Sequence, residues 1–257
     1  MKLFLNALLT LLCFYFVNAQ AATITGSIEF AHRIISSLPV SGTVQTLNAQ
    51  SGQAIKKGDL LLRLDPLLFE SAVIQAKSQL TIQDADYKEA KRDLVHAMEL
   101  FDRGVLSTIE LEKATLNEKR AQARETISKA KLQRAQYLFE HSAIFAPFDG
   151  WVLEVKVKAG ENINNTLSTQ TMLVIAEGGS YQAVFKLSLS SIKLLKLAKS
   201  VKLKVAGKRY SGKIVATGLE PITLSASSKA GYKIHVAFKS NGDLLRSGET
   251  ASITLAN

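Results

Sequence analysis

The sequence predicts a multidomain, elongated α+β protein in which a small β-sandwich is interrupted by a long α-helical hairpin and followed by a small β-barrel. Three observations lead to this prediction: a stretch that occurs twice, a helix-rich segment between the two copies, and short alternating runs in the last third. The predicted boundaries are 1–21 for a signal peptide, 22–66 for an N-terminal barrel strand and the first half of the sandwich, 67–141 for the hairpin, 142–179 for the second half, and 180–257 for the barrel.

The first residues have the features of a secretory signal peptide. Lys2 precedes an apolar run from Leu3 to Val17, and small residues follow in an Ala-x-Ala arrangement from Ala19 to Ala21. A bilayer-spanning helix needs about 20 apolar residues, so the run is short for an uncleaved anchor and we expect cleavage. The only cysteine, Cys13, lies in this segment, so a mature chain would contain no thiol and no disulfide.

The internal repeat predicts the sandwich. Ser41–Val44 aligns with Asp149–Val152 at an offset of 108 positions. Each copy alternates apolar and other residues, as half-buried strands do, and has glycines where turns need a positive φ. We therefore expect the two copies to close against each other. The same offset pairs Leu47 with Val155, Ala49 with Val157, Gly52 with Gly160, and Ile55 with Ile163.

The segment between the copies predicts the first arm of a helical hairpin. Residues 67–141 contain no proline and a single glycine, Gly104, and are rich in good helix formers. Apolar residues recur every seven positions, and mostly alanines occupy the second position of the same heptads, which predicts a coiled-coil seam. The first set is Val73, Leu80, Tyr87, Leu94 and Phe101, and the second is Ala76, Gln83, Ala90 and Ala97.

A second arm follows an interruption at Asp102–Gly104. Ser107 or Thr108 can cap its first turn, with Glu110 close behind. Each arm of about 35 residues would extend roughly 50 Å. Two faces of this arm are candidates for packing on the first, and the presence of both suggests a second partner such as a neighbouring copy; a plain helical bundle is the alternative. One face is Leu116, Ala123, Ile127, Ala130 and Tyr137; the other is Ala121, Ser128, Leu132, Ala135 and Phe139.

The last third predicts a small β-barrel. Short alternating runs are separated by turn residues, with a short helix at about Ser190–Lys199, and an early strand at Thr23–Phe30 is expected to join them. The predicted strands are Tyr181–Leu187, Val201–Val205, Tyr210–Thr217, Tyr232–Phe238 and Thr250–Leu255.

The two copies and the segment between them resemble a known family, the membrane fusion proteins (periplasmic adaptor subunits) of tripartite efflux systems of the RND type. The resemblance covers nearly all of the chain after the signal peptide. It implies a lipoyl-like barrel-sandwich hybrid split by a coiled-coil hairpin. The motifs that carry it are Gly52-x-x-Ile55-Lys56-Lys57-Gly58-Asp59-Leu60-Leu61 in the first half and Ile144-x-Ala146-Pro147-Phe148-Asp149-Gly150-x-Val152 in the second.

The resemblance also implies a location, partners and a role. It implies a periplasmic adaptor in a Gram-negative cell envelope that links an inner-membrane transporter, with the RND type favoured, to an outer-membrane channel protein. A homo-oligomer is implied, and we expect a hexamer. Many relatives have a further membrane-proximal domain built from both termini, which we expect to be missing here or supplied by another protein.

In this family the hairpin tip often carries Arg, then Leu four residues on, then Ser seven residues after that, and this motif docks on the channel. Leu100 and Ser107 fit the spacing, with Val105 and Leu106 beside them, but His96 stands at the Arg position. Ser107 either docks or merely caps its own helix. His96 loses the permanent charge of Arg and either makes docking pH-dependent or is a plain solvated side chain.

Basic residues are concentrated in the predicted barrel. From Ser180 to Asn257 there are 13 Lys and Arg against 3 Asp and Glu, whereas residues 67–141 contain 12 of each. Such a surface attracts an acidic protein patch or anionic lipid headgroups; a merely solvated lysine face is the alternative, and nucleic-acid binding is disfavoured by the export signal. The residues expected to face the transporter or the membrane are Lys199, Lys202, Lys204, Lys208, Arg209 and Lys213.

The sequence contains no recognisable catalytic arrangement. His32, His96, His141 and His235 lie in different segments without the spacing of a triad or a metal site. We therefore expect no enzyme activity, no cofactor and no metal. Two other functions stay open: an adaptor of an ABC-type exporter, and a coiled-coil scaffold of the envelope without a role in transport.

Overall fold

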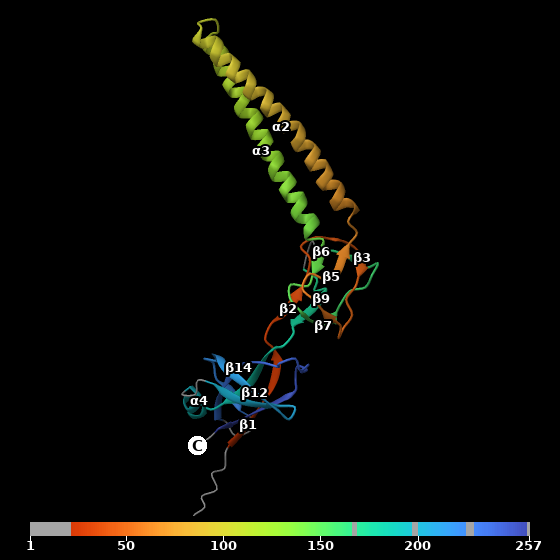
Figure 1. The fold of residues 1–257 in the computed structure, drawn as a ribbon, viewed down its shortest axis with the longest axis vertical. Helices are drawn as coiled ribbons and strands as arrows, with labels where there is room; N and C mark the ends of the chain where they lie inside the picture. Colours follow the sequence, from red (N-terminus) through yellow and green to blue (C-terminus); the bar gives the residue numbers. More distant parts are fainter. Residues whose placement is uncertain (1–21, 166–168, 197–199, 225–228, 256–257) are drawn as a thin grey trace, which may run out of the picture. The chain divides into compact units, whose positions relative to one another are not determined.

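The computed structural model describes residues 22–165, 169–196, 200–224 and 229–255 (Figure 1). The chain divides into two compact units. The sandwich unit comprises Ile34–Ala176, and the barrel unit comprises the parts of the chain on either side of it.

The sandwich unit contains two four-stranded sheets. Their strand orders are β2-β9-β7-β4 and β6-β5-β3-β8, so each sheet combines strands from before and after the long helices. The strands are β2 (Arg33–Ser36), β3 (Gly42–Leu47), β4 (Ala54–Ile55), β5 (Leu60–Leu64), β6 (Ala143–Phe145), β7 (Gly150–Val155), β8 (Asn162–Ile163) and β9 (Leu173–Glu177).

The two copies of the repeat exchange strands symmetrically. Gly42 of the first copy lies opposite Ile163 of the second, and Gly150 of the second lies opposite Ile55 of the first. The offset of 108 positions relates Gly42 to Gly150 and Ile55 to Ile163, so the two pairings are equivalent. The expected closure of the two copies is therefore confirmed, and it takes the form of a pseudo-twofold exchange in which neither half completes a sheet alone.

The repeated glycines and apolar residues explain why both halves adopt the same path. Gly52 and Gly160 have φ values of +86° and +83°, which residues with a Cβ atom rarely adopt. Between the sheets, the side chains of Leu62, Leu64 and Ile163 are completely buried. The alternation seen in the sequence thus becomes the core of the sandwich.

Two long helices leave and re-enter this sandwich. α2 (Leu67–Asp102) follows β5, α3 (Thr108–Glu140) precedes β6, and the two pack against each other (Figure 1). The predicted seam of α2 faces α3, since Ala90 and Ala97 are buried. Phe101 is the exception, with 37% of its surface exposed near the end of the helix. A regular coiled-coil supercoil in this pair stays a prediction.

One of the two candidate faces of α3 packs on α2. Ala121 and Ser128 are buried, and Leu132 and Ala135 are half-buried. The assignment of Phe139 to this face is wrong: it is 37% exposed, and the preceding residue is half-buried in its place because the helical repeat of 3.6 residues drifts against a strict heptad. The other face stays exposed, at Leu116 (48%), Ile127 (55%) and Tyr137 (51%).

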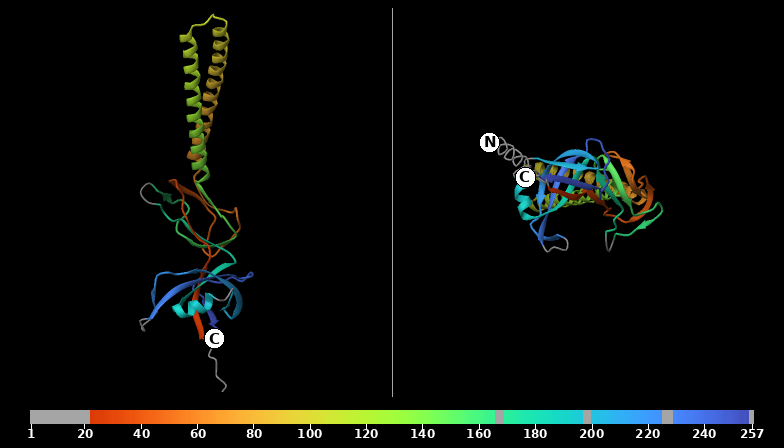
Figure 2. Two further views of the ribbon diagram at one scale, coloured as in Figure 1. Left: turned by 90° about the vertical axis from the view of Figure 1, so that its left-hand side faces the viewer. Right: turned by 90° about the horizontal axis from the view of Figure 1, so that it is seen from below.

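The barrel unit is a closed barrel of six strands. The order is β10-β1-β15-β11-β12-β14, and β14 pairs back to β10. β1 and β15, from the two ends of the chain, lie side by side (Figure 2). A short strand that the sequence did not predict, β13 (Ile222–Leu224), pairs antiparallel with β14. The six barrel strands are β1 (Ala22–Phe30), β10 (Ser180–Leu187), β11 (Val201–Val205), β12 (Lys208–Thr217), β14 (Lys229–Lys239) and β15 (Thr250–Leu255).

The barrel closes over its own apolar core. Tyr181 and Phe185 are completely buried, and α4 (Leu189–Lys196) contributes Ile192, which is 3% exposed. A Cβ atom on Gly26 would lie 2.2 Å from the carbonyl oxygen of Val184, so only glycine allows β1 to approach β10 this closely. The predicted helix Ser190–Lys199 ends at residue 196, and residues 197–199 lie outside the described part of the chain.

Candidate interaction sites at the hairpin tip and on the barrel

The end of α2 is a Schellman motif. The backbone N–H of Gly104 donates to the carbonyl oxygen of Phe101, and the N–H of Val105 donates to that of Leu100, both over 2.9 Å. Gly104 has a φ of +71°, the left-handed conformation that this motif requires. The interruption at Asp102–Gly104 is therefore a defined helix stop.

The start of α3 is a capping box. The hydroxyl of Ser107 accepts from the N–H of Glu110 over 3.3 Å, and the Glu110 carboxylate accepts from the N–H and the hydroxyl of Ser107 over 3.0 and 2.8 Å. The backbone hydrogen bond from Ser107, followed by the hydroxyl bond, lowers the pKa of Glu110. The expected capping role of Ser107 is confirmed.

The predicted tip residues lie around these two motifs. Val105 is 71% exposed, Leu100 and Leu106 are half-buried, and His96 is exposed further along α2. Because one cap ends at Val105 and the next begins at Ser107, Leu106 is the single residue between them. The turn is thus held by backbone and side-chain hydrogen bonds and exposes the apolar side chain of Val105. Docking of these residues on a channel stays a prediction.

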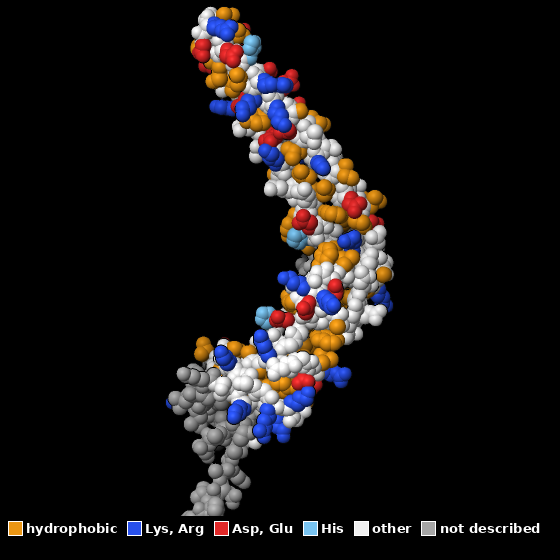
Figure 3. Space-filling model, viewed as in Figure 1, with side chains coloured by type: hydrophobic (Ala, Val, Ile, Leu, Met, Phe, Trp, Pro, Cys, Tyr) orange, Lys and Arg blue, Asp and Glu red, His pale blue; other side chains and the backbone are white. Residues whose placement is uncertain are grey.

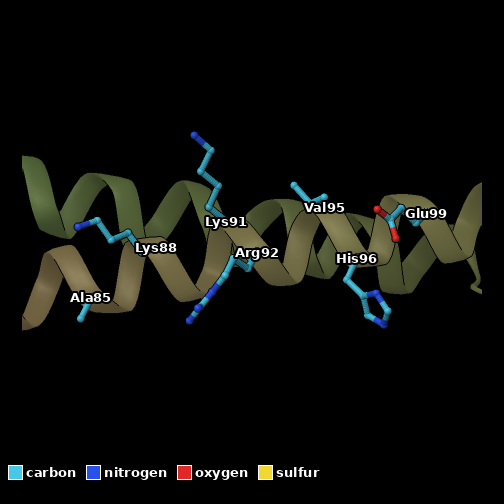
Figure 4. Close-up of a pocket in the computed structure, with 7 residues that line it drawn as sticks. All are labelled: Ala85, Lys88, Lys91, Arg92, Val95, His96 and Glu99. Atoms are coloured by element: carbon cyan, nitrogen blue, oxygen red, sulfur yellow. The ribbon is translucent and has the colours of Figure 1, made fainter.

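His96 lines a shallow groove on one face of α2, and all the lining residues come from this helix (Figure 4). Arg92, one turn before His96, lines the same groove. This arginine was not predicted from the sequence, although its spacing of four residues places it on the same helix face as His96. The permanent charge lost at His96 is therefore present one turn earlier. The lining residues are Ala85, Lys88, Lys91, Arg92, Val95, His96 and Glu99.

A charged residue is buried in the seam of the hairpin. Glu125 is 6% exposed and forms an ion pair with Lys129 over 2.5 Å. On α2, the side-chain oxygen of Gln83 is buried without a partner among the described residues. The hydrogen bond that the Lys129 ammonium group donates to Glu125 is the main reason why the pKa of Lys129 is raised. The polar position at Gln83 was predicted from the heptads of α2, whereas the buried Glu125 was not predicted.

Two of the predicted basic residues of the barrel stand directly opposite each other. Lys204 on β11 pairs in register with Arg209 on β12, and both are exposed. Like charges in this position are destabilising, and no ion pair found among the described residues involves Lys202, Lys204, Arg209 or Lys213. Figure 3 shows mainly Lys and Arg among the charged side chains of this face of the barrel. We call these four residues the basic wall.

Lys208 differs from the basic wall because it has a counter-ion. Its ammonium group lies 2.5 Å from the carboxylate of Asp243, which also accepts from the hydroxyl of Tyr210 over 2.8 Å. The bond from Lys208, followed by that from Tyr210, lowers the pKa of Asp243. Burial raises the pKa of Tyr210 to about 12. Lys199 lies outside the described residues.

Among residues 22–165, 169–196, 200–224 and 229–255, no group of three or more His, Cys, Asp or Glu side chains is arranged to hold a metal ion. Within the same ranges, no helix is both long and apolar enough to span a bilayer.

Residues 37–176 match the family model described as "RND MFP, barrel-sandwich hybrid domain". Relatives named "Multidrug resistance protein MdtA" are 30% identical over 155 residues in Proteus mirabilis and 30% identical over 186 residues in Klebsiella pneumoniae. The matches cover 60% and 72% of this chain but 38% and 44% of the relatives. The chain thus spans less than half the length of these relatives.

Solved structures share the fold. A MacA–MexA chimeric protein containing the α-hairpin domain of Pseudomonas aeruginosa MexA matches with a TM-score of 0.68 and 24% identity, over 93% of this chain and 82% of its own. The membrane fusion protein Spr0693 of Streptococcus pneumoniae R6 matches with a TM-score of 0.68 and 16% identity, over 92% and 99%. At these sequence identities, the structural similarity shows a shared fold and nothing further.

Proposed function

The chain belongs to the membrane fusion proteins of RND-type systems, and we propose that it is a periplasmic adaptor that links an inner-membrane efflux transporter to an outer-membrane channel without catalysing a reaction. The family model covers more than half of the chain, including both halves of the sandwich. We further propose that residues 1–21 direct export to the periplasm and that the domain boundaries follow residues 21, 66, 141 and 179.

The observation that carries this function is the geometry of the hairpin tip. The Schellman motif and the capping box fix the turn between α2 and α3, so presenting Val105 to a partner costs little conformational entropy. An exposed apolar residue flanked by the half-buried Leu100 and Leu106 suits the apolar groove between helices of another protein. His96 and Arg92 lie about two and three turns before the end of α2, where they would add polar contacts. Such a tip supports docking on a helical channel end.

The exposed face of α3 supports a homo-oligomer. Ile109, Leu116 and Tyr137 follow heptad spacing and are 65%, 48% and 51% exposed, which is the pattern of a second seam. The outer charges are complementary: α2 has four basic and seven acidic residues, and α3 has seven and five. We propose that α3 of one copy packs beside α2 of the next, and the family resemblance suggests six copies.

The barrel supports contact with the transporter or with the membrane beside it. The residues of the basic wall lack counter-ions among the described residues, and Lys204 and Arg209 repel each other in the free protein. An acidic partner surface would relieve this repulsion. Lys208 contributes less, since Asp243 already neutralises it.

Photo-crosslinking in cells tests the proposal. A crosslinking amino acid at Val105 is expected to capture an outer-membrane channel protein, identified by mass spectrometry. The matched control is Ser78, an exposed α2 residue more than six turns from the tip, where capture of the channel is not expected. If well-expressed protein captures only its own copies or cell-wall components from Val105, the adaptor function is wrong and the envelope scaffold replaces it. Capture of an ABC transporter from the basic wall would contradict the RND assignment of the partner.

A further inference from the structure

One end of the barrel exposes two leucines on neighbouring segments. Leu189, the first residue of α4, is 55% exposed, and Leu219, in the turn between β12 and β13, is 92% exposed. The N–H of Gly218 donates to the carbonyl oxygen of Lys233 over 2.7 Å and so holds this turn against β14. α4 contacts the same strand and is anchored by the buried Ile192. Both leucines therefore stand on fixed segments beside β14.

Three lysines surround these leucines. Lys186 on β10 lies directly opposite Lys233 on β14, and Lys193 follows Leu189 by one turn of α4. All three are exposed, and none takes part in an ion pair with another described residue. Glu220, next to Leu219 in the turn, offsets one of the three charges. The like-charged pair across β10 and β14 is unfavourable in isolation, which indicates an anionic partner.

This end of the barrel is also the end at which β1 begins. Phe30, at the end of β1, pairs with Tyr181 near the start of β10, so the chain continues into the sandwich unit from the opposite end. Ala22 then lies where β10 finishes at Leu187. With residues 1–21 removed, the chain begins at the end of the barrel that exposes the leucines.

We propose that this end of the barrel binds the surface of an anionic lipid bilayer. The leucines enter the headgroup region, and the lysines lie along it with their ammonium groups against lipid phosphates. A bilayer fits better than an acidic protein surface because the two leucines protrude singly beside exposed lysines. We call these residues the docking end: Lys186, Leu189, Lys193, Leu219 and Lys233. The proposal needs neither transporter nor channel, and it assigns the membrane contact proposed above for the barrel to residues outside the basic wall.

Co-sedimentation with vesicles tests the charges. Protein purified from cells that express the full sequence is expected to bind phosphatidylcholine–phosphatidylglycerol vesicles and to bind pure phosphatidylcholine weakly. Each lysine near an anionic surface contributes about a fivefold factor, so the triple variant Lys186→Gln, Lys193→Gln, Lys233→Gln is expected to bind on the order of 100-fold more weakly. The matched control changes three exposed lysines of the hairpin instead, Lys77, Lys119 and Lys131.

A fluorescent label tests insertion of the leucines directly. Cys13 is the only cysteine in the sequence, so a Cys13→Ser background accepts a single environment-sensitive label at Leu219→Cys. On anionic vesicles its emission is expected to rise and to be quenched by brominated lipid. A label at Ser211→Cys, an exposed position on β12, is expected to stay unquenched.

Three results would overturn the proposal. One is equal binding of the triple variant and the natural protein to anionic vesicles. Another is loss of binding only when the basic wall is neutralised. The last is a triple variant that still binds vesicles but loses crosslinks to an inner-membrane protein in cells. That result would show that the docking end contacts a protein instead of lipid. Capture of the channel from Val105 is independent of all three, so the proposed function can fail separately.

Discussion

The two β units and the helical hairpin are built on different principles. The sandwich and the barrel bury large apolar side chains completely, such as Leu62 and Phe185. The buried residues of the hairpin are small or polar: Ala90, Ala97, Ala121, Glu125 and Ser128. The β units therefore depend on contacts between distant parts of the chain, whereas the hairpin depends on helix caps and a narrow seam. A hairpin with so little core leaves most of its apolar surface available to partners.

Two spectroscopic signals can separate these regions. Trp151, the only tryptophan, lies half-buried in β7, so its fluorescence follows the sandwich. Far-UV circular dichroism is dominated by α2 and α3, which contain 36 and 33 residues. A substitution in the sandwich is therefore expected to shift the unfolding transition followed by Trp151 fluorescence. A substitution in the hairpin is expected to shift the transition followed by far-UV circular dichroism.

The largest expected effect is in the sandwich core. Leu62→Ala removes a completely buried side chain from β5, and such substitutions cost about 2–5 kcal/mol. Urea unfolding followed by Trp151 fluorescence is expected to show this loss. Leu68→Ala is the matched control, because Leu68 is 79% exposed at the start of α2, and a change within about 0.5 kcal/mol is expected. Equal losses in the two variants would contradict the contrast between core and hairpin.

The barrel is expected to lose stability in alkali through Tyr210. Its pKa is raised from 10.0 to about 12, so its contribution is complete below pH 10 and is lost as the pH rises toward 12. The expected loss at about pH 11 is roughly 1 kcal/mol. Thermal midpoints at pH 8 and pH 11 measure it. Tyr210→Phe is expected to reduce the difference, whereas the half-buried Tyr232→Phe is the control; an unchanged difference in Tyr210→Phe would show that other groups cause the alkaline loss.

In the hairpin, removing the buried charge is expected to increase stability. Glu125→Leu replaces a desolvated carboxylate with an apolar side chain and leaves Lys129, whose side chain is 60% exposed, in contact with water. Replacing a buried charge with an apolar side chain is often neutral or stabilising where no unpaired charge stays buried, and we expect a gain of about 1 kcal/mol in the free energy of unfolding followed by the far-UV signal. Glu112→Leu, at an exposed position of α3, is the control. A loss of several kcal/mol in Glu125→Leu would mean that the carboxylate stabilises the seam.

A smaller effect is expected at the start of α3. Ser107→Ala removes the capping hydroxyl, which costs about 0.5–1 kcal/mol, and the far-UV transition is expected to shift while Trp151 fluorescence stays unchanged. The lowered pKa of Glu110 means that its contribution is present above its ordinary pKa of 4.5 and is lost as the pH falls through the lower value in the folded protein. The variant is therefore expected to lose less stability in acid than the natural protein; an identical acid response would rule out this coupling.

The sequence predicted the parts of the fold that follow a period. The 108-residue offset predicted that the two copies pair, and the heptads of α2 predicted its seam, because both signals repeat along the chain. The β13 strand was missed because three residues are too short to show alternation. The two faces of α3 were equally apolar in sequence, and only packing on α2 selects Ala121 over Leu116.

The candidate sites were less predictable because they depend on contacts across the chain. Ser107 and Glu110 were recognisable as a cap from their spacing. The ion pair of Lys208 with Asp243 joins residues 35 positions apart, and nothing local marks it. The burial of Glu125 likewise depends on how α3 rotates against α2. Charge counts therefore located the basic surface but did not show which of its lysines have counter-ions.

The smallest expected effect on stability is at the hairpin tip, and it tests the comparison most directly. Val105 is 71% exposed and its backbone N–H completes the Schellman motif, which does not depend on its side chain. Val105→Ser is therefore expected to change both transitions by less than about 0.5 kcal/mol while it reduces capture of the channel by a crosslinker placed at Leu106. Ile74→Ser, at an exposed position of α2 (66%) far from the tip, is expected to leave capture unchanged. If Val105→Ser instead lowers stability as much as Leu62→Ala does, the tip belongs to the structural core of the hairpin and is not a surface held ready for a partner.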